Sequence, residues 1–375
     1  MNLVLIIAAS VLCHAAFTGV RVAVSLQALT DGGSPFVIGV LMALMAVLPM
    51  MLGVASGRWT DRVGARRPLL VGGSLVFLGA LLPAVFPVLP VLFLTAALIG
   101  TGMMAAQVAL QNAVGELSAP AERAQNFSQM AIGMSLSSFA GPLIAGFAID
   151  HFGYRVAFAV LAALPLVAVA TLRLGRLQLP PPSPHAELHV DRNILDLLRT
   201  RELRRVLLVS SLLAIGWDLH TFFVPIFGTQ IGLSASQIGT ILAAFALATL
   251  LIRLAMRWIA KRYTEWQVLT RAIFVVAGMY MLFPFAVNAW QLMLLSFTLG
   301  LGLGAAQPMV MALVHRIVPE GRAGEALGLR TMLMNSSQVA LPLVFGAVSA
   351  TLGMTPVFWS VAMCLGAGGY YTRKR

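Results

Sequence analysis

The sequence is divided almost end to end into apolar segments of about 20 residues, the length that a helix needs to cross the hydrocarbon core of a bilayer. Only helices and closed barrels satisfy their backbone hydrogen bonds in lipid, and 59% of the residues are hydrophobic, so we predict an all-α polytopic membrane protein. We expect twelve spanning helices, at residues 3–28, 36–57, 68–87, 89–114, 128–149, 155–173, 205–229, 236–256, 268–287, 290–314, 328–350 and 355–371.

The basic residues have a strongly one-sided distribution. The formal net charge of +12 would suit a nucleic-acid surface in a soluble protein, but 22 of the 25 Lys and Arg residues fall in alternate loops and in the tail. Arg155 alone falls on the other side. Because basic loops stay in the cytoplasm, we expect both termini to be cytoplasmic and expect no nucleic-acid partner.

The chain contains an internal repeat with an offset of 200 residues. Matching pairs occur in three separate stretches: Gly32, Ser34 and Gly39 with Gly232, Ser234 and Gly239; Gly100, Gly102 and Gln107 with Gly300, Gly302 and Gln307; Ser137, Pro142 and Gly146 with Ser337, Pro342 and Gly346. A shared register of this length predicts a duplicated six-helix unit. We expect a bundle at 1–174, a proline-rich linker with a short amphipathic helix at 175–203, and a second bundle at 204–375.

One short polar stretch between the second and third segments is unusually basic. Residues 57–67 carry four arginines and one aspartate, and their glycines suit a tight turn. The simplest interpretation is a loop whose charge only sets topology. The spacing Gly-x-x-x-Asp-Arg-x-Gly-x-Arg-Arg, however, resembles the signature loop of the major facilitator superfamily of secondary transporters. The residues that carry the resemblance are Gly57, Asp61, Arg62, Gly64, Arg66 and Arg67.

This resemblance implies two pseudo-symmetric six-helix bundles around a central cavity. It also implies that Asp61 acts as a conformational latch against the start of the eleventh segment, where Gly328 and Arg330 lie. In the second half, Ala260 stands in place of the aspartate, so the latch is expected only in the first half.

The fifth segment contains a second partial match. Gly141, Pro142 and Gly146 resemble the Gly-Pro-x-x-Gly-Gly core of the family's antiporter motif, with Ala145 in place of one glycine. Small residues and proline suit a pliable gating helix that packs closely on a neighbour. This match favours export.

Polar residues gather in the first, fourth, seventh and tenth segments, whereas the third, sixth, ninth and twelfth are almost free of them. Since polar side chains are costly in lipid, the polar segments are expected to line the cavity. The candidates for contact with substrate are Thr18, Arg21, Gln107, Gln111, His220 and Gln307. The amides could instead tie helices together.

Asp218 is the strongest candidate for proton coupling, because it lies about thirteen residues into its segment and therefore deep in the bilayer. It could equally be a structural carboxylate that neighbouring donors satisfy. Arg21 is expected at a similar depth, since the repeat matches it with Thr221. Arg21 could pair with Asp218 or extend to the interface. His14 shares a helical face with Arg21 and is either a second titrating group or a hydrogen-bonded histidine.

We therefore expect a secondary transporter that moves small organic molecules by alternating access, most simply a proton-coupled exporter in a bacterial inner membrane. Proton-coupled uptake is the main alternative, and a membrane-embedded enzyme or a receptor is a remote one. The sequence shows no nucleotide-binding loop and no metal-ligand or nucleophile cluster, so we expect no cofactor, no metal and no enzymatic activity. A monomer is what the resemblance implies.

Overall fold

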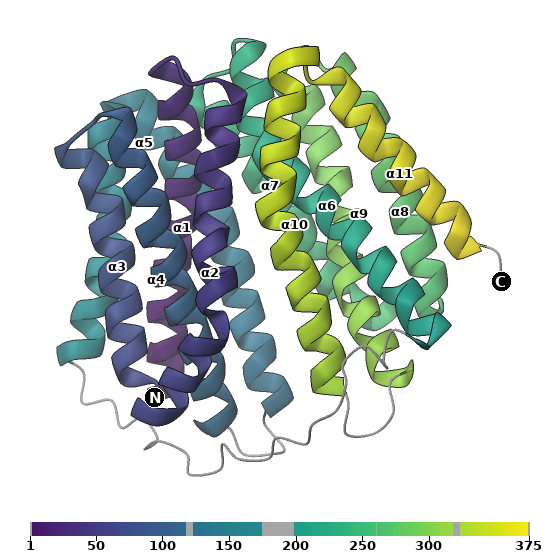
Figure 1. The fold of residues 1–375 in the computed structure, drawn as a ribbon, viewed down its shortest axis with the longest axis horizontal. Helices are drawn as coiled ribbons and strands as arrows, with labels where there is room; N and C mark the ends of the chain where they lie inside the picture. The colour runs from purple at the N-terminus through teal and green to yellow at the C-terminus, as the bar shows by residue number, and fades with distance from the viewer. Residues whose placement is uncertain (1, 118–122, 175–198, 260, 318–322, 374–375) are drawn as a thin grey trace.

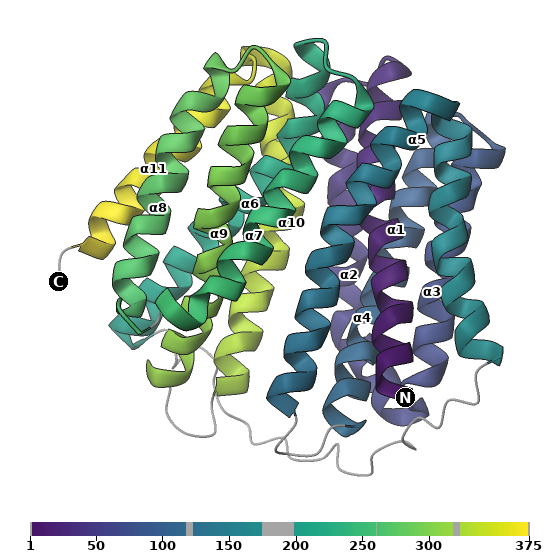
Figure 2. The same cartoon turned by 180° about the vertical axis from the view of Figure 1, so that it is seen from behind.

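A computed structural model describes the chain apart from residues 1, 118–122, 175–198, 260, 318–322 and 374–375. Its helices are α1 (Asn2–Thr30), α2 (Pro35–Val63), α3 (Arg66–Val85), α4 (Leu89–Leu117), α5 (Arg123–Leu174), α6 (Arg201–Gln230), α7 (Ala235–Ile259), α8 (Glu265–Leu282), the 3-10 helix η2 (Phe283–Phe285), α9 (Ala289–Ile317), α10 (Ala323–Leu352) and α11 (Thr355–Arg373). Helices α1 to α5 form one lobe and helices α6 to α11 form the other (Figures 1 and 2). The predicted linker helix lies mostly outside the described residues.

Helix α5 contains two of the predicted spans. Its backbone leaves the helical region at Gly153, where φ is 79° and ψ is 172°. A positive φ of this size suits glycine and reverses the chain direction. Ten helical stretches of the described chain are long and apolar enough to cross a membrane, and the longest of them, Gln129–Leu174, includes both spans of α5.

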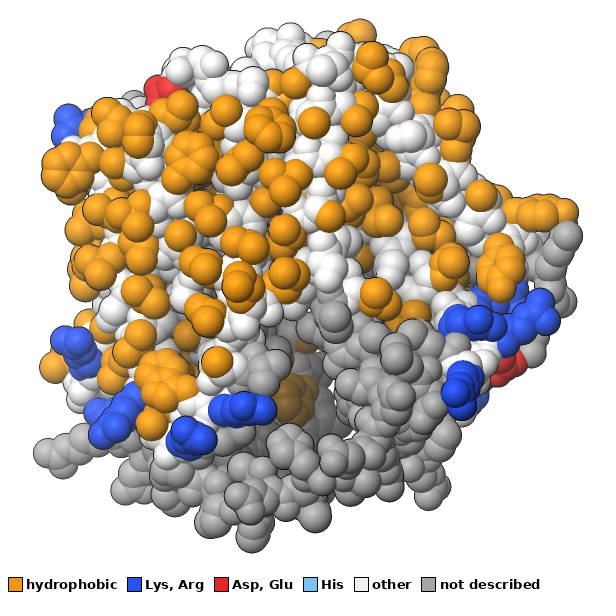
Figure 3. Space-filling view, in the orientation of Figure 1, with side chains coloured by type: hydrophobic (Ala, Val, Ile, Leu, Met, Phe, Trp, Pro, Cys, Tyr) orange, Lys and Arg blue, Asp and Glu red, His pale blue; other side chains and the backbone are white. Residues whose placement is uncertain are grey.

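The molecular surface is that of a membrane protein. Large apolar side chains are exposed around the bundle, among them Trp290 at 76% and Phe152 at 70%. Figure 3 shows this apolar band above a lower edge where Lys and Arg gather. The N terminus and the Arg58–Arg67 loop lie at that edge (Figure 1). We call this the basic end and the opposite one the far end.

The predicted repeat is visible in the backbone. Gly32 and Gly232 have φ of 81° and 79°, and Gly153 and Gly353 both have φ of 79°. Each member of a pair therefore makes the same turn at the far end of its lobe. The fifth positive-φ glycine, Gly64, ends α2 and has Thr264 at the equivalent position, which caps α8 instead.

The two lobes touch at the far end through two matched interfaces, α2 with α10 and α5 with α7. Gly39 packs on the backbone of Pro342, and its repeat mate Gly239 packs on that of Pro142. A Cβ atom on Gly346 would lie 2.9 Å from the carbonyl oxygen of Pro35. Because any side chain at these glycines would clash with backbone, they allow the lobes to close the far end.

Candidate functional site

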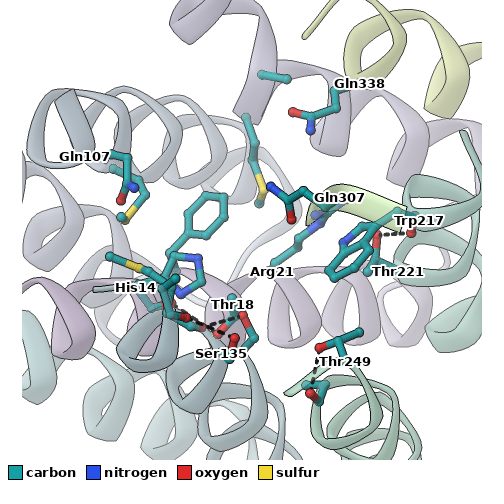
Figure 4. Close-up of a pocket in the computed structure, with 18 of the residues that line it drawn as sticks. His14, Thr18, Arg21, Gln107, Ser135, Trp217, Thr221, Thr249, Gln307 and Gln338 are labelled. Carbon is teal, nitrogen blue, oxygen red and sulfur yellow. Dashed lines mark hydrogen bonds between the residues drawn. The ribbon is translucent and has the colours of Figure 1, made fainter. Parts of the chain in front are cut away.

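A large cavity lies between the lobes and has a volume of about 860 Å³. Helices α1, α2, α4, α5, α6, α7, α9 and α10 line it, whereas α3, α8, α11 and the 155–174 part of α5 contribute no described residue to its wall. This division agrees with the polar pattern of the sequence. The polar side chains on the wall, many of them drawn in Figure 4, are His14, Thr18, Arg21, Gln107, Gln111, Ser135, Ser138, Thr221, Thr249, Arg253, Gln307, Asn335 and Gln338.

The rest of the wall is apolar and includes aliphatic residues, aromatic rings and methionines. Trp217 packs edge to face on Phe245 with ring centroids 4.8 Å apart. The methionines of the wall are Met45, Met103, Met104, Met130, Met134 and Met311. Methionine side chains adapt to ligands of different shape, and the volume falls within the range of sites for drug-sized molecules.

Arg21 points into this cavity from α1, between Thr18 and the side chains of α6 and α9 (Figure 4). Its Nε lies 3.4 Å from the sulfur of Met42. Arg21 and Asp218 are near enough to interact electrostatically, yet no salt bridge within 4.0 Å joins them. The direct pair that the sequence suggested is therefore not formed in this conformation.

Asp218 lies on the wall of a smaller cavity of about 230 Å³ that shares Trp217, Arg253, Gln307 and Gln338 with the larger one. Its side chain is only 5% exposed. Its Oδ2 is buried and has no hydrogen-bond partner within the described part of the chain. Protonation of this oxygen would thus break no existing contact.

Arg253 is a second arginine at the centre of the site. It donates to the hydroxyl of Ser135 at 3.0 Å and to the amide oxygen of Gln307 at 2.8 Å. These two partners belong to different lobes and are both neutral. The guanidinium group therefore links the two lobes, and neither hydrogen-bond partner neutralises its charge.

Arg330 is a third arginine of the site; it is buried, at 8% exposed, and lies on the wall of the smaller cavity. Its Nε donates to the hydroxyl of Ser210 at 2.7 Å. The sequence suggested Arg330 as a basic partner for Asp61 at the start of the eleventh segment. In this conformation it points into its own lobe instead.

His14 accepts or donates a hydrogen bond of 2.6 Å between its Nδ1 and the hydroxyl of Ser137. Thr18 donates to the carbonyl oxygen of Ser137 at 3.2 Å. Both side chains line the large cavity and also tie α1 to α5. The structure thus matches the hydrogen-bonded alternative for His14 and still leaves it next to the cavity.

His220 is the one substrate-cavity candidate that lies elsewhere. It is fully buried behind the wall, stacked on Phe245 at 4.2 Å and hydrogen-bonded through Nε2 to Ser296 at 2.9 Å. It lines neither cavity. The reason is helical geometry, since a residue two positions from Asp218 points about 200° away from it.

The three predicted glutamines all line the large cavity. Gln307 accepts the hydrogen bond from Arg253. The side-chain oxygen of Gln107 is buried and has no partner among the described atoms. Gln107 and Gln111 lie one turn apart on α4.

The predicted gating stretch of α5 makes two different contacts. Gly141 meets α1 so closely that an added Cβ would lie 2.9 Å from the amide nitrogen of Gly19. Pro142 and Gly146 pack instead on the start of α7, at Gly239 and Ser236. The stretch therefore joins a helix of its own lobe to a helix of the other.

The predicted latch residues form the turn between α2 and α3. Gly57, Asp61 and Arg62 lie in the last turns of α2, Gly64 ends it, and Arg66 and Arg67 begin α3. The side chains of Arg62, Arg66 and Arg67 are exposed. The side chain of Asp61 is outside the described set.

The sequence interpretation missed Arg253 as a functional candidate, and it gave Arg330 only as a partner of Asp61 and not as a residue of the site. Both lie near the basic ends of their segments, where an arginine resembles an ordinary topogenic residue. The repeat could have identified both arginines, because the residues 200 positions earlier, Gly53 and Met130, carry no charge. A charge present in only one copy of a duplicated span is a candidate for a specific role.

Comparisons with known proteins agree with this architecture. The sequence profile of the Major Facilitator Superfamily matches residues 6–234 and 206–371. Among solved structures, a peptide transporter POT in complex with sulfate is similar with a TM-score of 0.81 and 16% identity, covering 99% of this chain and 93% of that one. At this identity the likeness concerns the fold.

Curated relatives have a higher identity. The chain is 28% identical over 353 residues to the tetracycline resistance protein, class C, of Escherichia coli, covering 88% of this chain and 84% of that protein. It is 26% identical over 223 residues to the multidrug resistance protein MdtG of Escherichia fergusonii, and this match covers 58% of this chain but only 55% of the relative. With the family profile matched along nearly its whole length, the chain belongs to the Major Facilitator Superfamily.

Proposed function

We propose that this protein is a secondary transporter that exports small organic molecules across a bacterial inner membrane in exchange for protons. Support comes from its family and from relatives named as multidrug and tetracycline resistance proteins. The observation that carries the proposal is the cavity between two lobes that are closed at the far end, with a buried carboxyl group beside it. It works as a monomer, since one chain supplies both lobes and the whole cavity.

The basic end faces the cytoplasm in this proposal, because arginine and lysine are retained on that side. The present conformation then closes the cavity from the outside. Glutamines and methionines of α4, α5 and α10 extend the cavity wall toward the basic end. A molecule that enters from the cytoplasm would meet these side chains first.

Asp218 carries the exchanged proton. Its carboxyl group is buried, lies beside the cavity and has one oxygen with no described partner. A substrate with a positive charge would favour the ionised carboxylate and displace the proton, which is the competition that exchange requires. His14, on the wall of the large cavity, is a second site for the proton and acts through its bond to Ser137.

The substrates are drug-sized amphipathic molecules. The large cavity offers aromatic and methionine surfaces together with amide and hydroxyl groups from both lobes. Apolar area supplies affinity in such a site, and a few polar groups set orientation. Thr18, Gln107, Gln111 and Gln307 are the polar contacts, together with Arg21.

A second candidate function is proton-coupled uptake of an organic anion. It is favoured by the charge balance of the site, where Arg21 and Arg253 face one cavity with no acidic partner within 4.0 Å among the described residues. An anion beside Arg21 and a proton on Asp218 would stabilise each other. The anion and the proton would then favour each other's binding and not compete, which is the coupling that symport requires.

The test is substrate-driven proton movement in proteoliposomes with a panel of cationic, neutral and anionic compounds. Wild-type protein should move protons opposite to a transported compound, and Asp218→Asn should reduce this flux to that of empty liposomes because its amide cannot carry the proton. Asp31→Asn, a surface acid at the far end, is the matched control and should keep the flux. Movement of proton and compound in the same direction would establish uptake, and undiminished flux in Asp218→Asn would remove the site assignment.

A further inference from the structure

The contact between the lobes at the far end includes one charged group, Asp150, near the end of the first span of α5. Its Oδ1 accepts the backbone N–H of Ala235 at 3.0 Å, and its Oδ2 accepts that of Ser236 at 2.8 Å. The hydroxyl of Ser236 also donates a short hydrogen bond to Oδ2. All three donors belong to the first turn of α7, in the other lobe.

The start of α7 needs these acceptors. The first N–H groups of a helix have no partner within it. Ser234 and Gln237 satisfy each other's N–H groups, through bonds of 3.3 Å and 3.0 Å. The N–H groups of Ala235 and Ser236 are left for Asp150, whose negative charge also lies at the positive end of the helix dipole.

The repeat provides a comparison in the same molecule. At the matching interface α2 begins with Ser34, Pro35 and Phe36, and the position of Asp150 is occupied by Ala350. Pro35 has no N–H group, so this helix start needs one acceptor fewer. Glycine packing closes this interface without any carboxylate. A carboxylate is therefore not required merely to bring two such helices together.

We propose that Asp150 is the latch that holds the far end closed and sets how often the cavity opens there. Opening the far end must separate α5 from α7 and break three hydrogen bonds to one carboxylate. At the α2–α10 interface, Gly39 and Gly346 pack on the backbone of the other helix, and this packing is lost when the end opens. Since Asp150 is exposed to solvent at the rim, water replaces the lost bonds, and the latch can be released and formed again in each cycle.

This role concerns the empty protein, so its test needs no substrate and stands apart from the export proposal. Spin labels on Val88→Cys and Val287→Cys, both exposed and in far-end loops of different lobes, report the width of that end. The background carries Cys13→Ser and Cys364→Ser, because these are the free thiols of the chain. Pulsed electron resonance in lipid nanodiscs then gives the populations of closed and open distances.

Asp150→Asn should shift the ratio of open to closed molecules by about tenfold, because charge-assisted bonds are roughly twice as strong as neutral ones. Ala235→Pro removes one donor, copies Pro35 and leaves the carboxylate in place. It should shift the ratio in the same direction by less, and it remains informative if Asp150→Asn gives little folded protein. Ala350→Asp is the matched control and should not raise the open fraction, because a new carboxylate near the positive end of the α2 dipole can only favour the closed contact.

The proposal fails if both Asp150→Asn and Ala235→Pro keep the wild-type distance distribution. It also fails if Ala350→Asp widens the far end as much as Asp150→Asn does, since the effect would then be general to surface charge at the rim. An open fraction that rises in Asp150→Asn and in Ala235→Pro, with no rise in Ala350→Asp, assigns the far-end latch to Asp150.

Discussion

The two halves of this protein share the residues at which their helices turn and touch, but they differ in their ionisable side chains. The shared positions are glycines and prolines where helices turn or touch: Gly32 with Gly232, Gly39 with Gly239, Pro142 with Pro342, Gly146 with Gly346, and Gly153 with Gly353. At the glycines a side chain would meet backbone or the backbone has a positive φ, and the two prolines are the residues on which Gly239 and Gly39 pack. Steric limits of this kind apply equally to both halves, so both copies keep the same residue.

The ionisable groups differ between the halves. The unmatched pairs are His14 with Ala214, Thr18 with Asp218, Arg21 with Thr221, Gly53 with Arg253, Met130 with Arg330, and Asp150 with Ala350. Both halves line the large cavity together, so one copy of each group suffices there. A second buried charge would add a desolvation cost without a partner. Duplication thus supplies a symmetric scaffold in which a charge is placed once.

Not every close helix contact is shared by the two halves. A substitution at Gly141 tests one that only the first half has, and it should have the largest effect. Gly141 crosses Gly19 on α1, whereas the second half has Leu341 and Leu219 at these positions. Gly141→Val should lower stability by about 1–3 kcal/mol or more, because α1 must move away from α5. Thermal unfolding in detergent measures the change.

The control is Gly278→Ala in α8, where an added Cβ would meet nothing within 4 Å. This change should be neutral or stabilising, since alanine favours helix by up to about 1 kcal/mol over glycine. Equal melting temperatures for Gly141→Val and wild type would show that the α1–α5 crossing is looser than the structure has it.

Arg253 is a charged residue that only the second half has, since the repeat pairs it with Gly53. Its substitution therefore tests the role of a charge that is present once. Arg253→Gln should weaken binding of an organic carboxylate probe by about tenfold, the size expected for a lost charged hydrogen bond. The methyl ester of the same probe should bind almost as it does to the wild type. Equilibrium fluorescence titration in nanodiscs gives both dissociation constants.

Arg253→Lys separates charge from geometry, because lysine keeps the charge but cannot span Ser135 and Gln307 with a planar fork. An equal loss for ester and carboxylate in Arg253→Gln would assign Arg253 to holding the lobes together and not to anion recognition.

Asp61 gives the smallest expected effect, and it tests a feature that only the first half has. Asp61→Asn should slow turnover several-fold with little loss of folded protein, because a latch at the basic end acts only when that end closes. Initial transport rates in proteoliposomes, scaled to the folded protein recovered, measure it. Asp61→Glu keeps the charge and should recover most of the rate, and a wild-type rate in Asp61→Asn would leave the loop with a role in topology alone.

The spanning segments, the repeat and four of the eight cavity-lining helices, α1, α4, α6 and α9, could be predicted from the sequence. Each depends on a local or periodic property: an apolar run long enough for the bilayer, a constant offset of 200 residues, or polar residues confined to certain spans. These properties do not depend on how neighbouring helices pack. Even the break at Gly153 falls between two predicted segments.

The contacts within the site were decided only by the tertiary structure. Depth along a helix places Arg21 level with Asp218, but only packing shows that Met42 lies at the guanidinium of Arg21 and that no salt bridge joins the two charges. Likewise, His220 faces Phe245 and Ser296 because of its helical angle, and Asp150 meets α7 because two lobes close on each other. Direction and distance between helices come from long-range packing, which no single segment contains.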